Sequence, residues 1–385
     1  MDVTDLRIAL FSGNYNYVRD GANKALNRLV GYMLDHGAAV RVYAPKVENP
    51  AFEPTGDLVG LPNFPIPTRS EYRIPSGLND SVREDLAAFA PNVLHLSAPD
   101  FSAQAALKWA RERDIPVLAS VHTRFETYLR YYKLGFLEPW LEGRLRKFYN
   151  KCDALVAPAP GVIDVLRQQG MHTDISLWAR GVEREIFRPE ARDLGWRRSL
   201  GINDDEVAVG FLGRLVKEKG LDSFFATIDL LKAQSVAHKV LVVGDGPCRT
   251  WFAERVPGAS FAGFQQGADL GRAVASMDVL LNPSVTEAFG NVTLEAMACG
   301  VPVVAAQATG AENLVEPGRS GYLIEPGDTA SYADALRRYI EDADLRRAHG
   351  AAGELRSRDF SWDAINQAVA DTYLRLVAGR GSSPS

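Results

Sequence analysis

The stretch Asn282–Gly300 (NPSVTEAFGNVTLEAMACG) combines a glycine-containing turn with the start of a helix. It follows Val279–Leu281, an apolar run typical of a buried strand, and the helix is expected to begin near Gly290 or Asn291. The free backbone amides of Gly290, Asn291 and Val292 would then lie at the positive end of the helix dipole. This arrangement favours the binding of a phosphate.

Two glutamates flank this turn. Glu287 precedes it, and Glu295 lies eight residues later, just inside the helix. Carboxylates at an anion-binding turn would repel the anion. We therefore expect both to accept hydrogen bonds from sugar hydroxyls, because one carboxylate can accept two at once. For either glutamate alone, an acid that caps the helix and complements its dipole is the alternative.

Cations and glycines follow two other strand-like runs of the second half. Gly213–Gly220 (GRLVKEKG) contains three cations, among them Arg214 and Lys219, and predicts a positive site suited to a pyrophosphate. A solvated charged turn is the alternative. Gly244 and Gly246, in the sequence GDGP, form a second glycine-rich strand exit where a backbone could approach a ligand closely.

The first half offers weaker signals. The loop Ser12–Lys24, with Gly21 near its end, runs into a helix and could bring backbone amides to a phosphate. An ordinary strand-to-helix turn explains it equally. His122 follows the strand-like run Val117–Val121, where its side chain can reach a ligand, and a purely structural histidine is the alternative.

The segment Tyr128–Lys151 interleaves aromatic and basic side chains. Such a mixture suits a membrane interface or an amphiphilic acceptor. A pair of amphipathic helices packed on their own sheet would give the same pattern. Both interpretations stay open at this point.

Apolar runs supply the strands that must position these loops. Each run is followed by a segment of helical periodicity, which predicts parallel sheets covered by helices on both faces. The runs are Arg7–Phe11, Val40–Ala44, Val93–Leu96, Val117–Val121, Ala154–Ala157, Val207–Leu212, Lys239–Val243, Val279–Asn282 and Val301–Ala305. The expected fold class is therefore α/β, with two doubly wound domains.

The length of 385 residues also favours two domains, because one hydrophobic core seldom serves so long a chain. We expect an N-terminal domain over residues 1–185 and a C-terminal domain over residues 186–360. Residues 361–378 carry a helical apolar stripe that needs a surface to cover, and residues 379–385 are predicted to be disordered.

Composition is that of an ordinary globular protein, with 46% hydrophobic and 24% charged residues. The net charge of -5 comes from a balanced first half and an acidic second half, so nucleic acid is not expected as a partner. Cys152, Cys248 and Cys299 fit neither a disulfide framework nor a zinc site. With no secretory leader and no transmembrane run, the expected location is the cytoplasm, at the inner face of the membrane if Tyr128–Lys151 binds lipid.

The segment Glu287–Glu295 (EAFGNVTLE) resembles the paired-glutamate E-x7-E motif of the family-four retaining glycosyltransferases. The stretches GRLVKEKG, GDGP and GRSGYLIEPGD match that family in order and spacing, and DGANKALNRLV, VHTRFETY and ARGVEREIFRP add looser matches. The nearest members in appearance are α-mannosyltransferases and sulfoquinovosyl-diacylglycerol synthases of glycolipid synthesis. The resemblance implies the GT-B fold, two Rossmann-like domains facing across a cleft, with helix 361–378 packing back on the N-terminal domain.

The resemblance also implies a role for each residue singled out. Arg214 and Lys219 would hold the pyrophosphate, and His122 would touch the sugar from the acceptor side. Glu287 would hold the transferred sugar and Glu295 the ribose of the donor. The implied catalytic residues are Arg214, Lys219, Glu287 and His122, and the implied donor-binding residues are Gly21, Gly244, Gly246, Phe289, Gly290, Asn291, Val292 and Glu295.

The implied function is retaining transfer of a hexose from a UDP- or GDP-sugar to a lipid-type or glycan acceptor, giving an α linkage. The N-terminal domain would bind the acceptor and the C-terminal domain the nucleotide-sugar. No cofactor or metal is expected, since no Asp-x-Asp pair stands in the relevant loop. A sugar-nucleotide epimerase or hydrolase of the same fold, or a non-catalytic nucleotide-sugar binding protein, is the alternative.

Overall fold

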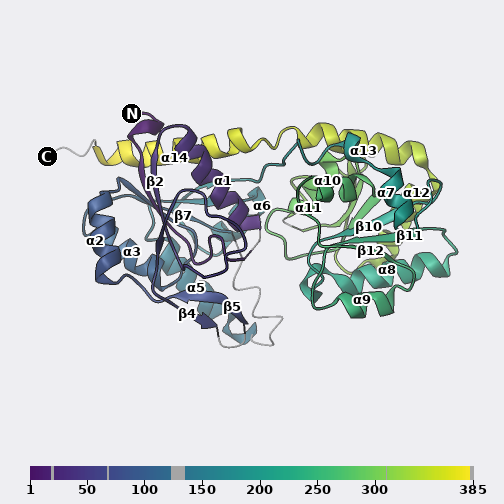
Figure 1. The fold of residues 1–385 in the computed structure, drawn as a ribbon, viewed down its shortest axis with the longest axis horizontal. Helices are drawn as coiled ribbons and strands as arrows, with labels where there is room; N and C mark the ends of the chain where they lie inside the picture. Colours follow the sequence, from purple (N-terminus) through teal and green to yellow (C-terminus); the bar gives the residue numbers. More distant parts are fainter. Residues whose placement is uncertain (19–20, 67–68, 123–134, 309, 382–385) are drawn as a thin grey trace. The chain divides into compact units, whose positions relative to one another are not determined.

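The computed structural model describes residues 1–18, 21–66, 69–122, 135–308 and 310–381 (Figure 1). The chain divides into two compact units. Unit 1 contains residues 1–180 and the chain from Trp362 onward, and unit 2 contains residues 181–361. The first crossing between the units lies close to residue 185, where the sequence placed the end of the first domain.

Unit 1 is built on a parallel sheet of seven strands in the order β3-β2-β1-β6-β7-β8-β9. In chain order the strands are β1 Arg7–Phe11, β2 Ala39–Ala44, β3 Asp57–Gly60, β6 Val93–Leu96, β7 Val117–Ser120, β8 Ala154–Ala157 and β9 Asp174–Leu177. The helices are α1 Gly21–Asp35, α2 Asp80–Phe89, α3 Phe101–Arg111, α5 Glu138–Tyr149, α6 Pro160–Gln168 and α14 Trp362–Gly381. The strands β4 Asn63–Ile66 and β5 Arg69–Pro75 form a separate antiparallel pair.

Unit 2 is built on a parallel sheet of six strands in the order β12-β11-β10-β13-β14-β15. In chain order the strands are β10 Ala208–Leu212, β11 Lys239–Val243, β12 Ser260–Gly263, β13 Val279–Asn282, β14 Val303–Ala306 and β15 Gly321–Ile324. The helices are α7 Leu194–Ser199, α8 Leu221–Ala233, α9 Arg249–Arg255, α10 Gly267–Ala275, α11 Asn291–Ala298, α12 Thr329–Glu341 and α13 Ala343–Ser357. The two doubly wound α/β domains predicted from the sequence are thus confirmed.

The inner strands are apolar throughout because helices cover both faces of a parallel sheet. Strands β6, β7 and β8 of unit 1 bury every residue, and so do β13 and β14 of unit 2. Their carboxyl ends all lie at the same edge of each sheet, so the loops that leave these ends gather there.

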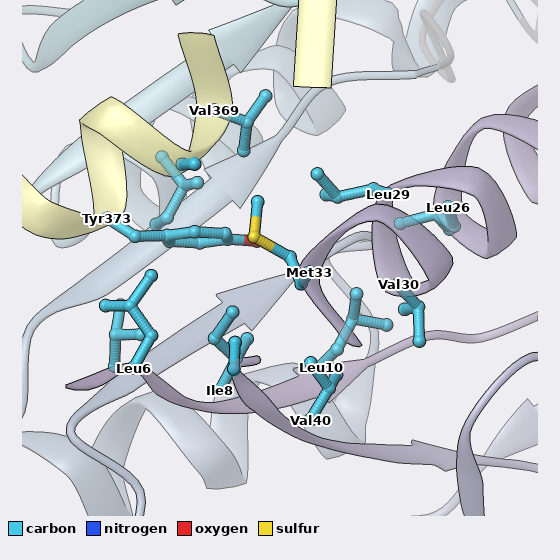
Figure 2. Packing of buried hydrophobic residues seen from close by; sticks show 14 of the residues in the cluster. Leu6, Ile8, Leu10, Leu26, Leu29, Val30, Met33, Val40, Val369 and Tyr373 are labelled. Atoms are coloured by element: carbon cyan, nitrogen blue, oxygen red, sulfur yellow. The ribbon is translucent and has the colours of Figure 1, made fainter. Parts of the chain in front are cut away.

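The last helix of the chain completes the core of unit 1. Helix α14 contacts α1, and the buried residues Val369 and Tyr373 of α14 pack in one apolar cluster with Leu6, Ile8 and Met33 (Figure 2). Val369 and Tyr373 are four residues apart and share one face of the helix. The apolar stripe read from the sequence therefore covers the surface of the first domain.

Helix α14 continues to Gly381, beyond residue 378, where the sequence predicted its end. Arg380 forms ion pairs with Asp114 and Asp153 of unit 1, which hold the extra turn against the domain. The rest of the predicted disordered tail, residues 382–385, lies outside the described residues. Across the described ranges, every helix is too short or too polar to span a lipid bilayer.

Candidate functional site

The strand order of unit 2 reverses between β10 and β13. Strands β11 and β12 follow on the side of β10, and strands β14 and β15 follow on the side of β13. Ligands of open parallel sheets bind outside the strand ends at such a reversal. The loops Gly213–Gly220 and Pro283–Gly290 leave β10 and β13 at this point. The charged and glycine-rich stretches singled out from the sequence are therefore neighbours in space.

An ion pair links these two loops. Lys219 ends a short 3-10 helix, Lys217–Lys219, and its Nζ lies 3.0 Å from Oε1 of Glu287. The two side chains are 30% and 11% exposed, so the pair is partly shielded from water. Thr286 Oγ1 also donates to the backbone oxygen of Glu218, at 3.1 Å. The loops are held together by both contacts.

Arg214 lies in the first of these loops, two residues after the end of β10. Its side chain is exposed, unlike that of the following Leu215, which is fully buried. The neighbouring loop after β11 packs on this segment through its backbone. Leu215 N donates to Asp245 O at 3.0 Å, and Gly213 N donates to Val243 O at 3.0 Å.

Gly244 and Gly246 permit this close packing. A Cβ on Gly244 would lie 1.9 Å from the backbone oxygen of Gly213, and one on Gly246 would lie 2.6 Å from that of Leu215. Gly244 also has a φ of +136°, which side chains rarely allow. Loop packing alone accounts for both glycines, and their contact with a donor stays a prediction.

Gly290 forms the turn into α11, whose first residue is Asn291, as the sequence predicted. Its φ is +91°, and a Cβ there would lie 2.5 Å from the backbone oxygen of Gly310. Glycine has no side chain with which to cap the helix, so it leaves the amides of Asn291 and Val292 to other acceptors. Phe289 anchors the turn, because it is buried with its ring edge-on to Phe360, at 5.9 Å.

Glu295 lies one turn along α11 from Asn291, on the same face of the helix. It is partly buried, and burial together with the charge of Glu295 raises the pKa of the Cys299 thiol. The side chain of Asn282 donates to Thr293 Oγ1 at 3.1 Å and so ties the end of β13 to this helix. Sequence reasoning did not find this buried contact.

The predicted residues of the first half lie in unit 1. Gly21 is the first residue of α1 and directly follows residues 19–20, which lie outside the described ranges. His122 follows β7, and its two ring nitrogens are both engaged: Nδ1 lies 2.8 Å from Nη2 of Arg180, and Nε2 lies 2.8 Å from Oγ of Ser120. Burial and the charge of Arg180 hold the pKa of His122 well below its usual range, so the ring is neutral.

The segment Tyr128–Lys151 is only partly described, because residues 123–134 lie outside the described ranges. Helix α5 buries Leu145 and Phe148 within unit 1. Its other side exposes Trp140, with the guanidinium of Arg144 5.2 Å from the ring centroid. The described part is therefore an amphipathic helix packed on its own domain that still presents an aromatic and a basic side chain to solvent.

Metal ligands are not gathered in the described ranges, where no group of three or more His, Cys, Asp or Glu side chains could hold an ion. The charged groups of the site are instead the Lys219–Glu287 pair, Arg214 and Glu295. Such groups suit a ligand that is anionic at one end and rich in hydroxyls at the other.

Known families match consecutive parts of the chain. Residues 19–186 match a family described as Glycosyltransferase Family 4, and residues 206–342 match one described as Glycosyl transferases group 1. A GDP-mannose-dependent alpha-mannosyltransferase of Mycobacterium tuberculosis is 30% identical over 296 residues, or 77% of this chain and 75% of that protein. A sulfoquinovosyl transferase of Arabidopsis thaliana is 29% identical over 373 residues, or 94% of this chain and 72% of that protein.

Solved structures share the fold at lower identity. Sucrose-phosphate synthase from Thermosynechococcus elongatus matches with a TM-score of 0.78 and 21% identity, over 97% of this chain and 99% of that one. The Anabaena protein HepE, solved in complex with UDP-glucose, matches with a TM-score of 0.73 and 20% identity, over 96% and 99% of the two chains. At these identities the likeness is one of fold.

Proposed function

We propose a function for this chain, which belongs to the family-four, group 1 glycosyltransferases and has their GT-B fold. It transfers a hexose from a UDP- or GDP-sugar to a lipid-type or glycan acceptor. The α configuration of the sugar is retained. The names of the relatives support both donor classes: one relative is GDP-mannose-dependent, and HepE was solved with UDP-glucose.

The observation that carries the donor site is the contact between Lys219 and Glu287 beside the glycine turn into α11. It gathers a cation, a carboxylate and a helix N-terminus where the strand order reverses. A carboxylate at this turn would repel the diphosphate of the donor. The ion pair reduces this repulsion, because Lys219 neutralises the charge of Glu287 before the donor binds.

We assign the donor's parts to these groups as follows. Arg214 and Lys219 hold the diphosphate, Glu287 holds the transferred sugar, and Glu295 accepts hydrogen bonds from the ribose. The backbones that approach the donor are those of Gly21, Gly244, Gly246, Phe289, Gly290, Asn291 and Val292. His122 of unit 1 contacts the sugar from the acceptor side.

The proposed reaction breaks the bond between the anomeric carbon and the diphosphate oxygen and forms a bond from that carbon to an acceptor oxygen on the same face. The electron pair of the broken bond stays on the diphosphate, which also takes the acceptor's proton. Arg214 and Lys219 stabilise the negative charge that grows on this leaving group, so their effect is largest in the transition state. We propose that no cofactor or metal takes part.

Calorimetric titration of UDP and GDP tests the donor site. We expect one of the two nucleotides to bind the wild type, and Glu295→Ala to lose about 1.5–3 kcal/mol of its binding free energy, the usual loss when a hydrogen bond to a charged group is removed. Glu254→Ala, which removes an exposed carboxylate on α9 of the same unit, is the control. Binding of neither nucleotide would contradict the proposal.

Product analysis separates transfer from the alternatives. Incubation with the nucleotide-sugar and an acceptor should give an α-linked product whose anomeric configuration is read by proton NMR. A free sugar or an epimerised donor as the main product, with or without acceptor, would instead indicate a hydrolase or an epimerase.

We also propose that the enzyme acts in the cytoplasm at the inner face of a membrane, which Tyr128–Lys151 contacts. The exposed Trp140 and its neighbour Arg144 support this, because an aromatic ring and a cation suit the headgroup region.

Co-sedimentation with lipid vesicles tests this membrane contact. The full chain should sediment with anionic vesicles, and less of it should do so at high salt. Neutralising Arg144, Arg146 and Lys147 should weaken the binding to vesicles. A triple neutralisation of Arg337, Arg338 and Arg347 in unit 2 is the control, and salt-insensitive or absent binding would refute the contact.

A further inference from the structure

Five side chains of unit 1 form one continuous series of hydrogen bonds, which we call the histidine relay. Nη2 of Arg180 lies 2.8 Å from Nδ1 of His122, and Nε2 of His122 lies 2.8 Å from Oγ of Ser120. That hydroxyl lies 2.9 Å from Nε2 of His95, whose Nδ1 contacts the hydroxyl of Tyr373. His95 and Ser120 come from the neighbouring strands β6 and β7, and Tyr373 comes from α14.

The relay has a direction because a guanidinium can only donate. Arg180 donates to Nδ1 of His122, so that nitrogen carries no proton and the neutral ring carries its proton on Nε2. Nε2 therefore donates to Ser120. The Ser120 hydroxyl, which is 1% exposed, and the fully buried Tyr373 hydroxyl both face the ring of His95, and a neutral ring can accept from only one of them.

Both rings are held neutral by their surroundings. Burial lowers the pKa of His95 to about 3. Burial lowers the pKa of His122 too, and the charge of Arg180 adds to that effect. A second proton on His122 would have to enter at Nδ1, against the guanidinium that already donates there.

We propose that Arg180 is a positioning residue: it fixes His122 as the Nε2-protonated ring and so presents one fixed edge of that ring to the bound sugar. The catalytic consequence rests on the proposed function, which assigns His122 to the sugar. Since both ring nitrogens are engaged within unit 1, His122 acts by contact and orientation, and not by proton transfer. Arg180 is itself fixed, because Nη1 donates to the backbone oxygens of Trp178 and Ala179.

One end of the relay lies where the chain first passes from unit 1 to unit 2. Arg180 is the last residue of unit 1 before the first crossing, and Tyr373 lies on the helix that begins at the second crossing, Trp362. The orientation of His122 therefore depends on how the first connection is anchored in unit 1.

Histidine tautomers test the relay directly. Long-range nitrogen–proton correlation spectra of the full chain, labelled with ¹⁵N-histidine, report which ring nitrogen carries the proton near neutral pH. We expect the proton on Nε2 in His122, with His122→Gln and His95→Gln assigning the signals. A proton on Nδ1 of His122, or a doubly protonated ring, would overturn the proposal.

Two variants separate positioning from general stability. In Arg180→Met, His122 loses its obligatory donor, and Nδ1 should become protonated in part of the molecules. In Ser120→Ala, Arg180 remains, and His122 should keep its proton on Nε2. Arg167→Met is the control, because Arg167 donates to backbone oxygens of Met171 and Thr173, and it should leave the tautomers and the transfer rate unchanged.

Activity gives the second readout. With the nucleotide-sugar as donor, Arg180→Met should lower kcat by roughly ten- to a hundredfold, the size expected for a misplaced group, while the nucleotide Kd stays at the wild-type value. Arg180→Lys, which returns a donor, should recover part of kcat. An unchanged kcat in folded Arg180→Met, or a loss confined to the nucleotide Kd, would refute the positioning role. If the wild type binds neither UDP nor GDP, the proposed function fails, and the tautomers still decide whether the relay exists.

Discussion

Lys219 and Glu287 were visible in the sequence because each lies in a short window with its own glycine turn and strand exit. The contact between Arg180 and His122 was not, because Arg180 follows the edge strand β9, which has no clear apolar run, so no predicted strand exit marks this arginine. One signal was available in the sequence: His95 interrupts the apolar run Val93–Leu96, and a polar ring inside a buried strand needs a partner. Short sequence motifs therefore predict the residues that contact a ligand better than they predict the residues that position them.

Replacing Lys219 with methionine tests the ion pair. We expect Lys219→Met to lower kcat/KM by about a hundred- to a thousandfold, because the charge that grows on the leaving group loses a donor. The loss in Lys219→Met/Glu287→Gln should be smaller than the product of the two single losses, since each change removes the other's partner. Steady-state kinetics measures both.

Lys217→Met is the matched control, because Lys217 lies in the same short helix but faces the ring of Trp251, at 5.6 Å. Its kcat/KM should stay near the wild-type value. Equal losses in the two lysine variants would assign the effect to general positive charge and not to the pair.

Protonation of His95 should make unfolding depend on pH. Its pKa is about 3 in the folded protein, whereas an unfolded histidine titrates near pH 6.5. The contribution of the neutral His95 ring to the free energy of unfolding is therefore complete above about pH 6.5 and is lost as the pH falls. The slope for this one group approaches 1.4 kcal/mol per pH unit. Urea unfolding between about pH 7 and pH 5 should show a smaller slope in His95→Gln. His36→Gln, which changes an exposed ring, should keep the wild-type slope, and equal slopes in all three would contradict the assignment.

The strands that sequence periodicity missed lie mostly at the sheet edges. Strands β3, β9, β12 and β15 end the two sheets, and each contains partly exposed residues. Their sequences, DLVG, DISL, SFAG and GYLI, are interrupted by polar residues and glycines, because an edge strand is covered on fewer sides than an inner one. Inner strands could therefore be predicted from apolar runs, and edge strands could not.

The inner strand β14 begins two residues later than predicted. The apolar run Val301–Ala305 becomes β14, Val303–Ala306. Pro302 has no N–H to donate to a neighbouring strand, although its backbone oxygen still accepts from Leu280 N, at 3.0 Å. The run of apolar side chains therefore starts before the ladder of hydrogen bonds does.

Gly290 and Gly327 form a matched pair for testing the turn into α11. Both have a φ of +91°, but a Cβ would meet the backbone oxygen of Gly310 at Gly290, whereas it meets no described atom within 4 Å at Gly327. Gly327→Ala should cost about 1–2 kcal/mol of unfolding free energy, the cost of the left-handed conformation. Gly290→Ala should cost more and should also weaken nucleotide binding, because the start of α11 must move. Urea unfolding and calorimetry measure the two effects, and identical behaviour of both variants would contradict the close contact.

At the scale of the whole chain, unit 1 depends on residues from both ends of the sequence. A chain ending at Ser361 lacks the buried residues Val369 and Tyr373, each of which contributes about 1.5–3 kcal/mol through burial. We expect the thermal transition of unit 1 to shift down or vanish in this variant, while the transition of unit 2 is kept. Differential scanning calorimetry resolves the two.

A chain ending at Gly381 is the control, because it keeps the whole of α14. It should melt like the full chain. If the shorter chain melts in the same way, the packing of α14 on unit 1 contributes little to its stability.

The place of α14 in unit 1 also has a consequence for synthesis. A ribosome releases the strand with Leu6 and Ile8 before unit 2, and the covering residue Tyr373 after unit 2. Unit 2 leaves the exit tunnel in between, with every residue of its own core already present. The domain that is translated first is therefore the one that finishes folding second, and its open apolar face is what a nascent-chain chaperone would meet during the interval.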